Sequence, residues 1–274
     1  MKKMTLDYII HENFLKLLRC GAFHEKSPLV PMSPWKWNKL YQLAVIHNVT
    51  TYIYNGICQC DDDFFLQIPH EQMETWRYVS MKSDTHKALA EYQSEKLTNP
   101  LINRKLQQII HNEPNTPTRQ LLIYIIGVAR HILTEGISLR QITELGSYIR
   151  NYKEGVDNEL LKKWLKELKM GRISQLEGEL LVKLFGFSPE EIHFTTIIPQ
   201  KIKKNLENEV FRLTGNHADD WYFTQGQSVF VTSRNTEALV WHVRHSIRYM
   251  PYYPGEAVTN FFVNFALSLS HIEE

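Results

Sequence analysis

The segment DNELLKKWLKELKMG, Asp157–Gly171, shows most clearly which fold class the chain adopts. Its apolar residues return every three or four positions, which is the period of an α-helix with one buried face. Asp157 is a preferred N-cap residue, and Gly171 is expected to end the helix. The predicted buried face consists of Leu161, Trp164, Leu165 and Leu168. A second apolar stripe follows at Ile173, Leu176, Leu180, Leu181 and Leu184.

The same helical period extends over most of the chain in both directions. Ser33 and Pro34 predict the start of an early helix, and Ser138 with Gln141 predicts a capping box. Only residues 221–232, WYFTQGQSVFVT, have aromatic and β-branched residues on both sides of a glycine turn, a pattern typical of a β-hairpin. The sequence therefore predicts a mainly α protein, a multi-helix, bundle-like body with one small β-hairpin near the C-terminal third.

The clearest break in the helical pattern is HNEPNTPT, His111–Thr118, because its prolines and asparagines are typical of a loop. It divides the 274 residues into an N-terminal helical region, 1–110, and a C-terminal helical region, 119–274. Each region leaves apolar helix faces that need covering. We therefore expect the two regions to form one continuous body.

Composition argues against several classes of partner. The chain has 31 Lys and Arg against 30 Asp and Glu, so its net charge does not favour nucleic acid as a partner. The N-terminus is too polar for a signal peptide. The longest apolar run, Leu121–Ala129, is shorter than the roughly 20 residues of a membrane span, and predicts a buried helix. These features predict a cytoplasmic protein with no membrane partner.

The three cysteines, an odd number, imply no disulfide framework. Cys58 and Cys60 are followed by the acidic run Asp61–Asp63, which suggests a metal site. Zinc sites usually have a Cys-x2–4-Cys pair and a second pair elsewhere, and the chain has neither. We expect one packed cysteine, one exposed cysteine and an acidic loop.

The stretch GSYIRNYKEGVDNE, Gly146–Glu159, is close to the signature of metal-dependent nucleotidyltransferases. In those enzymes a Gly-Ser turn leads into a helix, and two carboxylates on a strand hold the same metal ions. Here Asp157 and Glu159 lie at the start of a predicted helix, where residues two apart do not share a face. They are the candidate catalytic residues, but we expect no metal site from them.

Two groups of residues are candidates for ligand binding. His242, His245 and Arg248 are spaced by three and share one helical face, which could hold a phosphate or a nucleotide or could simply be a solvated basic face. Arg140 and Glu144 are spaced by four and are expected to form an ion pair on a helix surface. The face opposite the histidines is expected in the core, and consists of Leu239, Val243, Ile247 and Met250.

The run ARHILTEGISLRQITELGSYIRN, 129–151, resembles a helical module of the family of uncharacterised bacterial nucleotidyltransferases. The residues that carry the resemblance are His131, Gly136, Leu139, Arg140, Gln141 and Glu144. Three further segments, WKWNKLYQLAVIHNVTTYIYNGI, VDNELLKKWLKELKMGRISQ and LLVKLFGFSPEEIHF, are similar to other helices of that family. Between such flanks the family carries a catalytic core with a glycine-containing turn and an Asp-x-Asp strand. Nothing strand-like with paired acids precedes TNPLINRKLQQII in this chain.

The resemblance, with its catalytic core missing, implies a non-catalytic helical binding or regulatory protein, a degenerate relative of the nucleotidyltransferases. Its partner would be another protein or a nucleotide, with no cofactor. The alternative is a metal-dependent nucleotidyl- or phosphoryl-transfer enzyme with an atypical site, which would require Mg²⁺. A nucleic-acid binder using Arg244, His245 and Arg248 is disfavoured by the near-neutral charge.

Overall fold

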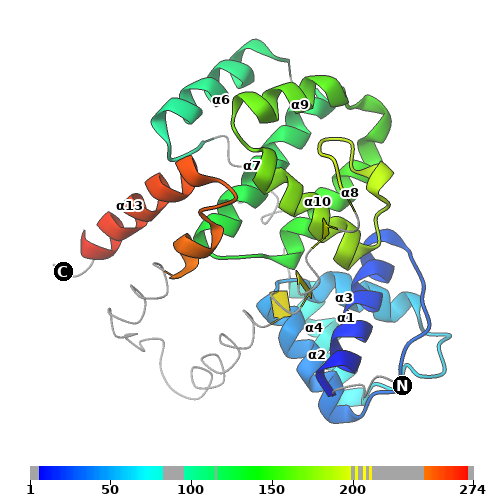
Figure 1. Cartoon of the computed structure of the whole chain (residues 1–274). Helices are drawn as coiled ribbons and strands as arrows, with labels where there is room; N and C mark the ends of the chain where they lie inside the picture. The colour runs from blue at the N-terminus through cyan, green and yellow to red at the C-terminus, as the bar shows by residue number, and fades with distance from the viewer. Residues whose placement is uncertain are drawn as a thin grey trace. The chain divides into compact units, whose positions relative to one another are not determined.

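The computed structural model describes residues 6–82, 96–114, 116–198, 201–202, 206–207, 210–211 and 244–270. Over these residues the protein is mainly α-helical, as predicted (Figure 1). The hairpin predicted at 221–232 lies outside the described residues. Contacts divide the chain into two units, each built from two separate segments. Unit 1 comprises Met1–Ala88 and Lys204–Gln227, and unit 2 comprises Leu89–Lys203 and Ser228–Glu274.

In the part of unit 1 that the structure describes, four helices belong to the N-terminal segment. They are α1 (Leu6–Phe23), α2 (Pro34–Ile46), α3 (Thr50–Gln59) and α4 (His70–Lys82). Pro34 begins α2 as expected, although the Ser33 side chain makes no capping hydrogen bond. Ile10, Phe14, Leu17 and Leu18 of α1 are buried, and Trp37 and Trp76 are fully buried. Phe211, from the second segment of unit 1, stacks on His11 with ring centroids 3.9 Å apart.

The helices α1 and α3 touch through two glycines. A Cβ atom at Gly21 would lie 1.8 Å from the carbonyl oxygen of Tyr52, and a Cβ atom at Gly56 would lie 2.1 Å from that of Leu17. Real Cβ atoms do not approach other atoms so closely, so neither position has room for a side chain. The two backbones therefore pack in direct contact.

Unit 2 surrounds α7 (Pro117–Thr134). Every residue from Leu121 to Ala129 on this helix is buried, which confirms that the longest apolar run is a core helix. The helices packed on it are α8 (Leu139–Tyr152), α9 (Asn158–Glu167), α10 (Gly171–Phe185) and α13 (Pro254–Ser270), and α6 (Pro100–Asn112) precedes it in the chain. Two 3-10 turns, η1 (Lys153–Gly155) and η2 (Pro189–Glu191), join or follow these helices. None of the described helices is long and apolar enough to cross a membrane.

Several helix ends of unit 2 follow the sequence signals. The side chain of Asn99 caps α6, that of Thr116 caps α7, and that of Asp157 caps α9. The predicted break at His111–Thr118 is the connection between α6 and α7, inside unit 2. Whether both predicted regions share one body stays a prediction.

One predicted helix boundary and one predicted capping box were wrong. Gly171 does not end α9 but begins α10. The chain instead leaves α9 at Leu168, and Lys169 takes a left-handed backbone with φ of 58° that reverses its direction. Ser138 stands at the N-cap position of α8 but makes no side-chain capping bond, so the predicted capping box does not form.

The C-terminal helix is fastened to α6 by one buried carboxylate. Glu256, in the first turn of α13, is only 1% exposed. One of its oxygens accepts hydrogen bonds from the backbone N–H and the hydroxyl of Thr98, at 2.6 and 2.9 Å, and the other accepts from the N–H of Asn99 at 2.9 Å. Glu256 therefore joins the start of α13 to the start of α6 (Figure 1).

Candidate functional site

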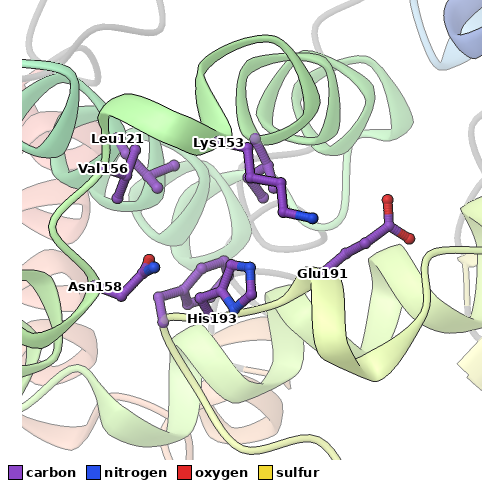
Figure 2. Close-up of a pocket in the computed structure, with 8 residues that line it drawn as sticks. Leu121, Lys153, Val156, Asn158, Glu191 and His193 are labelled. Atoms are coloured by element: carbon purple, nitrogen blue, oxygen red, sulfur yellow. The ribbon is translucent and has the colours of Figure 1, made fainter.

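A small pocket lies in unit 2, where η1 and the first turn of α9 approach the loop after η2 (Figure 2). Four polar side chains line it: Lys153, Asn158, Glu191 and His193. Its apolar wall consists of Leu121, Ile149, Val156 and Phe194. The space inside is about 10 Å³, roughly that of one water molecule. We call this site the Lys153 pocket.

Three side chains that can donate hydrogen bonds line the Lys153 pocket. Lys153 lies across the pocket from Asn158 and His193, and its ammonium group extends toward the side of Glu191 (Figure 2). Within the described part of the chain, no hydrogen bond or ion pair occupies these three side chains. The ammonium group of Lys153 can only donate, and the amide and imidazole groups can each donate one or more hydrogen bonds. Such a set suits an anionic oxygen.

Glu191, the acidic residue of the pocket, is already engaged on both carboxylate oxygens. Its Oε1 lies 3.1 Å from Nε of Arg150, and its Oε2 accepts a hydrogen bond of 2.8 Å from the backbone N–H of Ser188. The guanidinium group of Arg150 also lies over the ring of Phe187, 3.9 Å from its centroid. Glu191 thus fixes η2 against α8, and Arg150 offsets its charge.

The candidate catalytic carboxylates do not line this pocket. Oδ1 of Asp157 accepts a hydrogen bond of 3.0 Å from the N–H of Leu160, as expected of an N-cap. Glu159 has a side chain that is 85% exposed, and it pairs with Lys162 at 2.8 Å. The residue between them, Asn158, is the one that contributes to the pocket. Among the described residues, no three His, Cys, Asp or Glu side chains are grouped to hold a metal ion.

Arg140 and Glu144 form the predicted ion pair, but the prediction that it is a surface pair was wrong. Nε of Arg140 lies 2.9 Å from Oε1 of Glu144, and each side chain is only 4% exposed. Burial raises the pKa of Glu144, and the hydrogen bond and charge of Arg140 oppose that rise. The spacing of four residues fixes the pairing, but it does not say whether other helices cover the pair. Helix α8 is buried all round from Leu139 to Gly146.

The basic face predicted around His245 was also placed on the wrong side. His245 is buried, and its Nε2 lies 2.8 Å from the carbonyl oxygen of Ile132. Ile247 and Met250, expected in the core, are 63% and 37% exposed. Arg248 is half-buried, and His242 lies outside the described residues. A histidine that can hydrogen-bond a buried carbonyl group has taken the inner face of this helical turn.

Glu177 is a buried carboxyl group that the sequence analysis missed. It is 0% exposed, and neither of its oxygens has a hydrogen-bond partner in the described part of the chain. Burial raises its pKa well above the ordinary 4.5. A signal was present, because Glu177 lies four residues after Ile173 and four before Leu181, on the predicted buried stripe of α10.

Comparison of the sequence with protein-family models, and of the chain with curated proteins and solved structures, found no match.

Proposed function

We propose that the chain is a non-catalytic helical binding protein whose Lys153 pocket takes the phosphate group of a nucleotide. The observation that carries this proposal is that three side chains able to donate hydrogen bonds, those of Lys153, Asn158 and His193, line one pocket. Glu191 adds little repulsion there, because Arg150 and Ser188 already occupy its oxygens.

The narrow pocket has room for one phosphate oxygen rather than for a whole nucleotide. The space that a water-sized group can occupy inside it is about 10 Å³, roughly that of one water molecule. Asn158 is the first residue of α9, so the positive end of that helix dipole adds to the charge of Lys153. The base and sugar would then lie outside the pocket.

The non-catalytic part of the proposal rests on how the two acidic residues are engaged. Asp157 caps α9, and Glu159 pairs with Lys162 on the surface. A degenerate nucleotidyltransferase relative, as the sequence resemblance implies, would retain a phosphate site without paired metal-binding carboxylates. The bundle-like body, the hairpin at 221–232 and a cytoplasmic location belong to the same proposal.

The test is calorimetric titration of the protein with inorganic phosphate and with nucleoside mono- and triphosphates, with and without Mg²⁺. The informative variant is Lys153→Ala, and the matched control is Lys163→Ala, an exposed lysine on α9 outside the pocket. A charge-assisted hydrogen bond is worth about 1.5–3 kcal/mol. We expect binding to weaken about tenfold or more in Lys153→Ala and to stay unchanged in the control.

Three outcomes would count against the proposal. Equal weakening in both variants would mean that the ligand senses only general positive charge. No binding of any of these compounds would remove the pocket as a phosphate site. Mg²⁺-dependent transfer of a nucleotide, lost in Asp157→Asn, would overturn the non-catalytic part and support the alternative, a metal-dependent transferase.

A further inference from the structure

Unit 1 holds two cysteine thiols in contact with one another. Cys20 belongs to α1, and Cys60 is the residue that ends α3. Their Sγ atoms are 3.3 Å apart, although the residues are 40 positions apart in the chain. Cys20 is 0% exposed and Cys60 is 3% exposed. The third cysteine, Cys58, is exposed. In the Cys-x-Cys pair, Cys60 is therefore the predicted packed cysteine and Cys58 the predicted exposed one.

The contact between the thiols follows from the way in which α1 and α3 pack. Cys20 directly precedes Gly21, and Cys60 lies one helical turn after Gly56, the two positions at which the backbones touch. The N–H of Cys60 donates a hydrogen bond of 3.1 Å to the carbonyl oxygen of Gly56. Beyond the glycines, Nδ1 of His24 lies 2.8 Å from Oε1 of Gln59. The two helix ends are therefore fixed on both sides of the thiol pair.

We propose that Cys20 and Cys60 form a reversible disulfide by exchange with a small-molecule disulfide. One thiol loses its proton and attacks the small disulfide, which gives a mixed disulfide and releases one small thiol. The other protein thiol then attacks the protein sulfur of that mixed disulfide, forms the Cys20–Cys60 bond and releases the second small thiol. In sum the protein pair loses two electrons and two protons, and the small disulfide gains both.

The geometry requires only a small movement for the final bond. A disulfide has an S–S distance of about 2.05 Å, and the two Sγ atoms are already 3.3 Å apart. The two sulfur atoms must approach further for the bond to form. The close contact of α1 and α3 at Gly21 and Gly56 holds the two cysteines beside one another.

The burial of Cys20 and Cys60 makes their exchange with a small disulfide slow. Burial, and next the hydrogen bond with Cys20, raise the pKa of Cys60 to about 12. Since the thiolate is the attacking species, the pair exchanges slowly while the packing is closed. Exposed Cys58 meets the small disulfide first, and a mixed disulfide on Cys58 is the competing product. The proposal therefore describes a response to sustained oxidation rather than to a brief exposure.

The experiment treats the full-length protein and its Cys58→Ser variant with glutathione disulfide. The proteins are digested without reduction, and the peptides are identified by mass spectrometry. We expect a peptide cross-linked through Cys20 and Cys60 in both proteins, complete loss of that peptide after dithiothreitol, and a higher thermal midpoint for the oxidised Cys58→Ser protein than for the reduced one. Neither protein alters the buried pair, so the result does not depend on a core variant that fails to fold.

Two results would overturn the proposal. One is a glutathione adduct on Cys58 with Cys20 and Cys60 still free after long exposure. The other is a cross-link between Cys58 and Cys60 that leaves Cys20 reduced. The Cys20→Ala variant supplies the matched negative control, because it retains Cys58 and Cys60 and must not yield the cross-linked peptide.

Discussion

At the scale of single residues, Glu177 couples the stability of unit 2 to pH. Burial raises the pKa of its carboxyl group in the folded protein, whereas the unfolded chain releases the proton near the ordinary 4.5. A group with a raised folded pKa contributes its full stability below the unfolded pKa, and this contribution is lost as the pH rises towards the folded pKa. Each pH unit in that window costs about 1.4 kcal/mol.

We therefore predict that Glu177→Gln gains stability over the wild type as the pH rises above about 4.5. The glutamine amide does not titrate, so its own cost of burial is the same at every pH. Urea unfolding of both proteins across a pH series measures the difference in free energy of unfolding, and other titrating groups cancel in that difference. A constant difference across the series would show that Glu177 keeps its ordinary pKa.

The Arg140–Glu144 pair gives a second prediction at this scale. Replacing Arg140 by methionine leaves the buried carboxylate of Glu144 without its cation, and such a change typically costs about 3–5 kcal/mol. The double variant Arg140→Met with Glu144→Leu should recover most of that loss, because it removes both charges.

The exposed pair of Glu159 and Lys162 supplies the control, since surface pairs contribute about 0–1 kcal/mol. Denaturant unfolding of Arg140→Met, the double variant and Lys162→Met measures the free energy of unfolding that each change costs. Similar small losses in both single variants would mean that water reaches the Arg140 pair in solution.

At the scale of helices, the contact between α1 and α3 depends on residues without side chains. A methyl group at Gly56 would overlap the backbone of Leu17, and backbone atoms cannot move aside as a flexible side chain can. Overpacking of this kind costs about 1–3 kcal/mol, and the better helix propensity of alanine returns up to about 1 kcal/mol.

We predict that Gly56→Ala lowers the stability of unit 1, whereas Gly171→Ala does not lower that of unit 2. A Cβ atom at Gly171 meets nothing within 4 Å, so this glycine is a matched control in a helix. Thermal unfolding followed by circular dichroism measures both changes. If Gly56→Ala kept the thermal midpoint of the wild type, as Gly171→Ala should, then α1 and α3 could move apart without any loss of stability.

At the scale of the whole molecule, unit 1 requires a segment that lies far along the chain. Phe211 stacks on His11, and its ring meets that of Phe14 edge-on with centroids 5.6 Å apart. Leu206 and Val210 are each 1% exposed, so this short segment belongs to a core. The predicted N-terminal region, 1–110, contains none of these three residues.

We predict that residues 1–110 alone unfold with low cooperativity, and that adding a peptide of residues 204–227 raises their thermal midpoint. A peptide carrying Phe211→Ala should have a much smaller effect, because it lacks both ring contacts. Cooperative melting of 1–110 that the peptide leaves unchanged would show that the N-terminal helices form a complete core by themselves.

Some of these features could be predicted from the sequence, and others could not. Helix positions and the N-caps at Asn99 and Asp157 were predictable, because periodicity and capping depend on residues within one turn or two. The burial of the Arg140–Glu144 pair could not be predicted, since it depends on which other helices cover α8. The Lys153 pocket was not predictable either, because only the fold brings Asn158 and His193 to the same pocket. Glu177 was accessible in principle from its place on an apolar stripe.

The interleaved order of the segments has a consequence for biosynthesis. The N-terminal helices leave the ribosome long before Phe211 is translated, so unit 1 cannot be completed until the first segment of unit 2, Leu89–Lys203, has been made. During that interval the apolar surface around Phe14 lacks its aromatic partner, and nascent chains with such surface are prone to aggregate. Synthesis of this protein should therefore depend on chaperones that hold the first helices until the later segment arrives.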